Sequence, residues 1–475
     1  FVNMSSDPEQ DYFSDGLTEE ILNSLAMLPE LQVTARTSSF HFKGQNIPVP
    51  EIAKKLGVAH VVEGSVRRGG DTLRITAQLI LASDGSHLWS NTYDRSVKDV
   101  LDVQRDVAES IAQALDVVLD AKRSQEMFAS GTRNVEAFEA YHKGLAYSTS
   151  VHSLISDKNL WDANIYFAQA IAADPKFAAP HQDIQDAYEH YLMEGANSQF
   201  LKKGEPEDLN AAEALRQLRF HQNKAIELAN TRESKLSAEI AKAFESDDWQ
   251  DMPRMLKMVR QNPSIFNTVT SSVWWIDILH ALGEGELIVP QLQEEIVHSP
   301  YSRLSWYYLI SHHLGKGNFE EAKKIIEQSK QYSLFKDIPT IELYILSGDQ
   351  IKLKEIYDQM GQAGDYTPAT LLAALGKKEE TLLKISQEVQ KKERTKDLTW
   401  AYYLIGAQDK ANAIITEIDK RPLGALMFAQ ILLTPGKIHA SKESAPNFVR
   451  KLRQAGIAED KINAMFLPSN TETNP

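Results

Sequence analysis

A set of large and small residues spaced along residues 306–329 constrains the fold of this chain more than any other feature. Large residues share one helical face before a turn at Gly317, and small or apolar residues share one face after it. In a helical hairpin, a large side chain such as Trp306 packs against a small one such as Ala322, which lets the two helices approach. The spacing therefore predicts a pair of packed helices. Its landmarks are Trp306, Leu309, His313, Gly317, Phe319, Ala322, Ile326 and Ser329.

The same spacing recurs elsewhere in the chain. Trp249 and Phe319 both stand between a turn and a second helix, two periods of about 35 residues apart. An earlier unit ends on four matching landmarks, which are Ala163, Phe167, Ala170 and Pro175. The pattern resembles the tetratricopeptide repeat, whose stacked hairpins hold protein or peptide partners. The resemblance implies an all-α superhelical array at 131–335, then degenerate repeats and a C-terminal cap at 336–460, and a tail at 461–475.

Composition narrows the kinds of protein that this chain can be. The 475 residues carry 65 acidic and 51 basic side chains, a formal net charge of −14. A nucleic-acid clamp needs a basic face, so we expect no direct contact with nucleic acid. The chain has no cysteine, which excludes disulfides, thiolate nucleophiles and cysteine-ligated zinc.

Residues 1–125 change their periodicity from helix to strand and back. Apolar spacing predicts a helix around Leu17–Leu28, preceded by Asp15-Gly16, and a short helix at 50–56 that ends at Gly57. Alternation and glycine-rich turns predict strands at 31–37, 58–68, 73–81 and 87–95. A long helix at 100–118 would then cover the sheet. This pattern predicts a small α/β layer domain.

Several motifs in this region occur together and in order. They are Phe1-Val2-Asn3-Met4-Ser5-Ser6-Asp7-Pro8, Phe13-Ser14-Asp15-Gly16-Leu17-Thr18-Glu19-Glu20, Ala35-Arg36-Thr37-Ser38-Ser39-Phe40, Glu63-Gly64-Ser65-Val66-Arg67-Arg68 and Leu88-Trp89-Ser90-Asn91-Thr92-Tyr93-Asp94-Arg95. They resemble the TolB-N-like (FlgO-like) domain. The resemblance implies a sensory or protein-interaction module with no catalytic residues.

The resemblance implies two settings for such a module joined to tetratricopeptide repeats. One is the periplasmic region of a CadC/ToxR-type membrane-bound transcriptional regulator, whose winged helix and membrane helix come first. The other is the cytoplasmic regulatory region of a class III adenylate or guanylate cyclase. We expect the first setting, a non-enzymatic periplasmic region with a membrane anchor upstream of Phe1. We keep the cyclase setting as the alternative.

Two surfaces are candidates for binding a protein or peptide, or a second copy of the chain. In the α/β domain, Trp89, Tyr93 and Arg95 share one strand face, and Arg36 ends a neighbouring predicted strand. The structural alternative is an aromatic layer packed under the long helix, with Arg95 at its rim. In the array, inner positions of the first helices would line a groove. These positions hold Gln182, Asp186, Tyr307 and Ser311.

Residues that could carry chemistry are few. Adjacent acid pairs on a helix diverge by about 100° and cannot act together, so we expect no catalytic site. Asp186, His190 and Glu194 share one helical face at a spacing of four, where a metal could bind and support a hydrolase. A plain surface cluster explains them better. We therefore expect neither a cofactor nor a metal.

Overall fold

In the computed structural model, the chain forms two compact units. Unit 1 consists of Phe1–Ile184, Glu227–Asn230 and Glu294–Ser302, and unit 2 of Gln185–Ile226, Thr231–Gln293 and Arg303–Pro475. The structure describes residues 1–7, 10–128, 131–151, 160–194, 201, 206, 208–262, 274–335, 338–363, 367–390, 395–433 and 438–467. Among these residues, no helix combines the length and apolar composition needed to cross a bilayer.

Unit 1 begins with a four-stranded sheet of order β1-β2-β3-β4. β1 runs parallel to β2, and the other two pairs are antiparallel. The two hairpin turns hold Gly70 and Gly85 at positive φ, which suits residues without a side chain. The three predicted strands at 58–68, 73–81 and 87–95 are confirmed. The strands are β1 (Val2–Asn3), β2 (His60–Gly69), β3 (Thr72–Leu81) and β4 (His87–Ser96).

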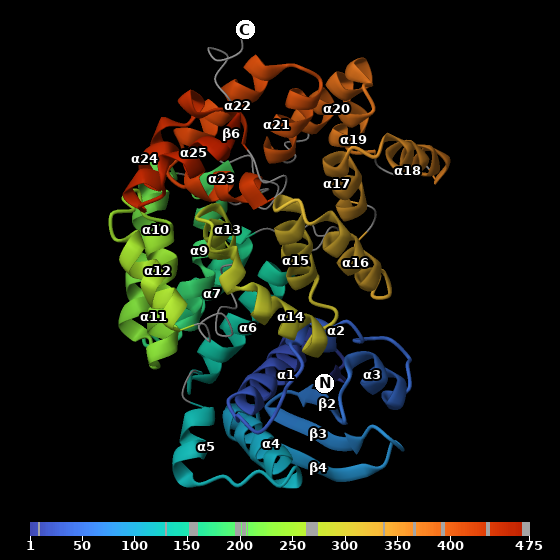
Figure 1. Cartoon of the computed structure of the whole chain (residues 1–475). Coiled ribbons are helices and arrows are strands. Elements are labelled where there is room, and N and C mark those ends of the chain that lie inside the picture. Colours follow the sequence, from blue (N-terminus) through green and yellow to red (C-terminus); the bar gives the residue numbers. More distant parts are fainter. Residues whose placement is uncertain are drawn as a thin grey trace, which may run out of the picture. The chain divides into compact units, whose positions relative to one another are not determined.

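Two amphipathic helices pack against one face of this sheet (Figure 1). Apolar residues of α1 (Asp11–Ala26) and α4 (Val100–Ala114) form a buried core with alternate residues of β3, namely Leu73, Ile75, Ala77 and Leu79. The prediction that a long helix covers the sheet is confirmed. The remaining helices of unit 1 are α2 (Arg36–Phe40), α3 (Val49–Leu56), α5 (Ala121–Met127), α6 (Val135–Val151), α7 (Leu160–Ala173) and α8 (Ala179–Asp183).

The strand predicted at 31–37 is wrong. Residues 31–35 have no regular structure, and α2 begins at Arg36. The hydroxyl of Ser39 bonds back to the Arg36 carbonyl at 3.1 Å, and the Ser38 and Ser39 amides donate to the Ala35 carbonyl. Serine side chains offer the backbone such local bonds, which here favour a helical turn over a strand.

Two helix boundaries also differ from the prediction. Asp15 and Gly16 lie inside α1, which begins at Asp11. A Cβ on Gly16 would come within 2.4 Å of the His142 ring on α6, so glycine is needed for helix contact rather than for a turn. α4 ends at Ala114, because the chain reverses at Asp116 with φ +58, and Val118 is 78% exposed.

The rest of the chain is a helical array, as predicted at the level of fold class. Its helices are α9 (Gln185–Glu194), α10 (Ala211–Leu228), α11 (Arg232–Phe244), α12 (Met252–Gln261), α13 (Trp274–Ala281), α14 (Val289–His298), α15 (Arg303–Gly315), α16 (Phe319–Lys330), α17 (Ile338–Ser347), α18 (Gln350–Ala363), α19 (Ala369–Ala374), α20 (Lys378–Gln390), α21 (Thr395–Leu404), α22 (Gln408–Asp419), α23 (Gly424–Leu433), α24 (Pro446–Gln454) and α25 (Glu459–Ala464). The sequence also predicts a loop insertion around residues 151–156 in the first hairpin, and beyond Val151 this segment lies outside the described residues.

Helical hairpins recur in both units. In unit 1, Gly144 of α6 faces Phe167 of α7, where an added Cβ would meet the ring at 2.5 Å. In unit 2, Trp306 and Ala322 are buried on the α15–α16 hairpin. Its turn places Gly317 at φ +72, and the next amide, on Asn318, donates to the His313 carbonyl at 2.8 Å. The same turn and bond follow α17, α19 and α21, at Gly348, Gly376 and Gly406.

The C-terminal part is not entirely helical, which corrects the all-α prediction. β5 (Ile438–Ser441) and β6 (Phe466–Leu467) form a parallel pair. β6 and most of α25 lie within residues 461–475, the range expected to be a tail. The strands pair because Ile438 and Phe466 are both buried and the Ile438 amide donates to the Met465 carbonyl at 2.7 Å.

Candidate functional site

The predicted binding face on β4 is divided between the core and the solvent. Tyr93 is 6% exposed, and its hydroxyl lies 3.4 Å from Ser110 Oγ on α4. Trp89 is half-buried against the same core. Arg95 is exposed, and its Nη1 donates to the Asp94 carbonyl at 3.1 Å. This is the arrangement of an aromatic layer under a helix, with the arginine at its rim.

Arg36 belongs to a different contact. It begins α2, and its Nε lies 3.1 Å from Glu19 Oε2 on α1. Its guanidinium also lies 4.3 Å from the centre of the Phe40 ring. Burial raises the pKa of Glu19, and the Arg36 charge acts against that rise. Arg36 therefore links α1 to α2.

The four predicted groove residues do not share one environment. Gln182 is half-buried on α8 in unit 1, whereas Asp186 is half-buried on α9 in unit 2. Tyr307 is half-buried and Ser311 fully buried, both on α15. Ser311 thus packs inside unit 2 and cannot line a groove without a rearrangement of α15.

The face predicted from Asp186, His190 and Glu194 is present on α9. His190 Nε2 lies 3.5 Å from Asp186 Oδ1, and its Nδ1 lies 3.7 Å from Glu194 Oε1. Burial opposes the imidazolium, but Glu194 and Asp186 together outweigh it and raise the pKa of His190. In the part of the chain that the structure describes, no three His, Asp or Glu side chains converge as a metal site.

Sequence reasoning missed a histidine pair in unit 2. His280 Nε2 on α13 lies 3.1 Å from His312 Nδ1 on α15, and His312 Nε2 lies 3.5 Å from Glu286 Oε1. Burial lowers the pKa of His280 to about 4, and the nearby His312 adds to the effect. His280 is therefore neutral at ordinary pH and serves as a half-buried polar contact between two helices.

A buried carboxyl predicts how the stability of the chain depends on pH. Glu245 follows α11, and its Oε2 accepts a hydrogen bond from Gln222 Nε2 at 2.5 Å. Burial raises the pKa of Glu245 from 4.5 to about 7, although Arg219 and Gln222 act in the opposite direction. The pKa of Glu245 is higher in the folded chain than in the unfolded chain, so protonated Glu245 contributes its full stabilising free energy below pH 4.5. This contribution is lost as the pH rises to about 7.

We therefore expect the urea midpoint of wild-type protein to fall over this pH range more than that of Glu245→Gln. The measurement is a series of urea unfolding curves for both proteins, and its readout is the difference between their midpoints at each pH. Parallel pH profiles for the two proteins would contradict the assignment.

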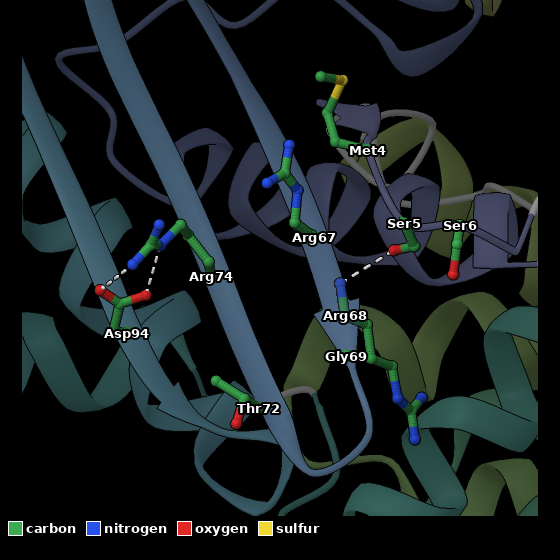
Figure 2. A pocket seen from close by; sticks show the side chains of 9 residues that line it. All are labelled: Met4, Ser5, Ser6, Arg67, Arg68, Gly69, Thr72, Arg74 and Asp94. Carbon is green, nitrogen blue, oxygen red and sulfur yellow. Dashed lines mark hydrogen bonds and ion pairs between the residues drawn. The ribbon is translucent and has the colours of Figure 1, made fainter.

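The open face of the sheet in unit 1 carries a pocket of about 530 Å³ (Figure 2). It lies between the loop after β1 and the ends of β2, β3 and β4. Its lining residues are Met4, Ser5, Ser6, Arg67, Arg68, Gly69, Thr72, Arg74 and Asp94.

Strand register sets the charges in this pocket. Arg67 of β2 stands directly opposite Arg74 of β3, and Arg74 stands opposite Asp94 of β4. Arg74 and Asp94 form a bidentate ion pair, with Nε to Oδ1 at 2.6 Å and Nη2 to Oδ2 at 2.9 Å. This hydrogen bonding raises the pKa of Arg74 and lowers that of Asp94. The carboxylate therefore engages only one of the two facing arginines.

The third arginine of the pocket is directed elsewhere. Arg68 Nη1 lies 2.8 Å from Glu139 Oε1 on α6 and 3.4 Å from Gln10 Oε1. The guanidinium also lies 5.5 Å from the Phe13 ring centre. Figure 2 shows this side chain pointing away from Arg67 and Arg74. Only its backbone amide serves the pocket wall, by donating to Ser5 Oγ at 2.9 Å.

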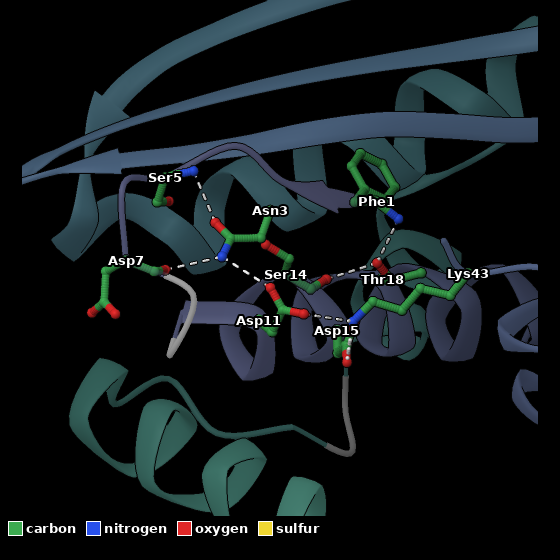
Figure 3. A network of polar contacts seen from close by, with 9 residues as sticks. All are labelled: Phe1, Asn3, Ser5, Asp7, Asp11, Ser14, Asp15, Thr18 and Lys43. Carbon is green, nitrogen blue, oxygen red and sulfur yellow. Dashed lines mark hydrogen bonds and ion pairs between the residues drawn. The ribbon is translucent and has the colours of Figure 1, made fainter. Parts of the chain in front are cut away.

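A polar network holds the loop that forms one wall of the pocket (Figure 3). Asn3 Oδ1 accepts from the Ser5 amide at 2.9 Å, and Asn3 Nδ2 donates to Asp11 Oδ1 at 2.9 Å and to the Asp7 carbonyl at 3.1 Å. Lys43 Nζ lies 3.3 Å from Asp11 and 2.7 Å from Asp15. The loop is thus fastened to α1 rather than left to solvent.

The sequence contained a signal for this pocket. The turn between β2 and β3 is two residues long, which fixes the register and places Arg67 opposite Arg74. Alternation places both on the face opposite Leu73 and Ile75. The aromatic residues of β4 instead favour a binding surface on the other face.

Comparison with known proteins gives one partial similarity. No protein-family model matches the chain. A protein of Rhizobium meliloti (strain 1021) described as "Putative adenylate cyclase 3" is 37% identical over 184 residues. The match covers 39% of this chain and 31% of that protein, so the chain spans about a third of the length of the relative that it matches. Over these 184 residues, the chain is similar to part of a protein described as "Putative adenylate cyclase 3".

Proposed function

We propose that this chain is a non-enzymatic regulatory and protein-interaction region of a signalling protein related to nucleotide cyclases. The observation that carries the proposal is the 37% identity over 184 residues to the protein described as "Putative adenylate cyclase 3". This similarity favours the cyclase setting over the transcriptional-regulator setting that the sequence first suggested. A cytoplasmic location belongs to the same proposal.

The proposed mode of action is partner binding by helical hairpins of the tetratricopeptide type. The buried Trp306 and Ala322, the close approach of Gly144 to Phe167, and the recurring glycine turns support this reading. The partner would be a protein or peptide, or a second copy of the chain. Its binding would change how the regulatory region acts on a catalytic domain.

Two measurements test this proposal. Purified chain incubated with ATP or GTP and Mg²⁺ or Mn²⁺ is expected to form no cyclic nucleotide above the buffer control. The coding sequence on the 5′ side of Phe1 is expected to encode a cyclase catalytic domain. Cyclic nucleotide formation by the chain itself would overturn the non-enzymatic assignment. A winged helix followed by an apolar segment of about 20 residues would instead support the transcriptional regulator.

A further inference from the structure

We propose that the pocket on the open face of β2, β3 and β4 binds the phosphate group of a small phosphorylated ligand through Arg67 and Arg74. The inference does not rest on the proposed link to cyclases. It rests on the charges, hydrogen-bond donors and fixed geometry of the pocket.

The charge balance of the pocket is the first argument. Arg67 is exposed, and the structure gives its guanidinium no ion pair or hydrogen bond with any described residue. Arg74 forms an ion pair with Asp94, and Arg68 forms one with Glu139. One positive charge therefore stays uncompensated, in a chain whose formal net charge is −14.

The placement of the two arginines is the second argument. Like charges directly opposite each other in an antiparallel pair destabilise the sheet. The β2–β3 register imposes this arrangement on Arg67 and Arg74. An anion bound between the two guanidinium groups would attract both of them and so offset their mutual repulsion. Arginine also suits this role, because its planar fork donates two hydrogen bonds to a phosphate.

Hydroxyl groups around the arginines supply further donors. Ser5, Ser6 and Thr72 line the same pocket. The Ser5 oxygen already accepts from the Arg68 amide, so its hydroxyl hydrogen can be donated to a ligand. The Arg67 guanidinium, the Arg74 N–H groups that Asp94 leaves free and three hydroxyls offer more donors than the two oxygens of a carboxylate can accept, whereas a phosphate monoester has three terminal oxygens.

Size and rigidity point to a ligand larger than a bare ion. The volume of about 530 Å³ falls in the range of small-molecule pockets, about 300 to 1,000 Å³. Met4 at the rim is 51% exposed and offers apolar surface to the rest of the ligand. The Asn3 network holds the Ser5 backbone in place, which reduces the ordering cost of binding.

The test is isothermal titration calorimetry of the whole chain with inorganic phosphate and with phenyl phosphate, using acetate and benzoate as carboxylate probes. We expect saturable binding of both phosphates, tighter for phenyl phosphate, and at least roughly tenfold weaker binding of the carboxylates. Arg67→Gln should weaken phosphate binding by roughly tenfold or more. Arg67→Lys, which keeps the charge but loses the fork, should lie between Arg67→Gln and the wild type.

Arg95→Gln is the matched control, because it removes the same charge from an exposed position of the same sheet, with alternation directing it to the other face. It should change phosphate affinity less than about twofold. The absence of phosphate binding would overturn the proposal. So would equal binding of phosphate and carboxylate probes, or equal weakening by Arg67→Gln and Arg95→Gln, which would indicate general charge attraction.

Discussion

Replacing Trp249 by alanine is expected to destabilise unit 2 by about 3–5 kcal/mol, the cost of removing a large aromatic side chain from a packed core. Trp249 is fully buried, and its Nε1 donates to the Phe244 carbonyl at 3.2 Å. Its ring lies 6.3 Å from that of Phe448 on α24, which stacks in turn on Phe428 at 4.7 Å. The substitution therefore removes an aromatic contact between the α11–α12 turn and α24.

The measurement is urea unfolding followed by circular dichroism of the helices. Phe220→Ala is the matched control, because Phe220 is on α10 of the same unit but 50% exposed, and it should cost less than about 1 kcal/mol. Similar losses of stability in the two variants would show that Trp249 does not connect α24 to the helices before it.

Replacing Gly144 by valine is expected to destabilise unit 1 by about 1–3 kcal/mol. An added Cβ would stand 2.5 Å from Phe167 Cε1 and 2.6 Å from Cδ1. Phe167 is fully buried, so its ring cannot move aside without disturbing its neighbours. The clash outweighs the helix propensity gained by replacing glycine, because that gain is below about 1 kcal/mol.

Gly131→Val provides the control for this second prediction. Gly131 is exposed, and an added Cβ would meet only Glu20 Oε2, at an ordinary 3.6 Å. Differential scanning calorimetry should show a lower melting temperature for Gly144→Val and little change for Gly131→Val. Equal melting temperatures for all three proteins would mean that α6 and α7 do not approach as closely as Gly144 allows.

The sequence predicted the parts of the fold that local chemistry specifies. β2, β3 and β4 were found because alternating apolar residues are separated by short turns, whose glycines stand at positive φ. The α15–α16 hairpin could be predicted because the spacing of the large Trp306 and the small Ala322 indicates two closely packed helices. In both cases a few residues determine the geometry.

The predictions of local structure are wrong where contacts between residues far apart in the sequence determine that structure. Gly16 resembled a turn residue in the sequence, but its role is to admit His142 of α6. Ser38 directly follows the strand wrongly predicted at 31–37; it is buried, and its Oγ accepts from the Tyr301 amide at 3.0 Å. No local sequence pattern indicates a contact with a residue more than a hundred positions away in the chain. The β5–β6 pair escaped prediction because each strand is very short.

The sequence predicts a binding face on β4 at Trp89, Tyr93 and Arg95, whereas the pocket lies on the opposite face of the sheet. Aromatic residues often mark binding surfaces, but Trp89 and Tyr93 pack against the core below α4. The alternation of apolar and polar residues in β2 and β3 predicts the strands and also places their polar residues on the outward face. Pairing Arg67 with Arg74 needed the register, which the two-residue turn had already fixed.

The central claim is most directly tested by measuring cyclic nucleotide synthesis by the full-length gene product that contains these residues. The account predicts that this protein forms cyclic AMP or cyclic GMP. It also predicts that Gly144→Val changes the rate by roughly fivefold or more, whereas Gly131→Val leaves it unchanged. A full-length product that forms no cyclic nucleotide, or whose rate does not respond to Gly144→Val, would contradict a regulatory role in a cyclase.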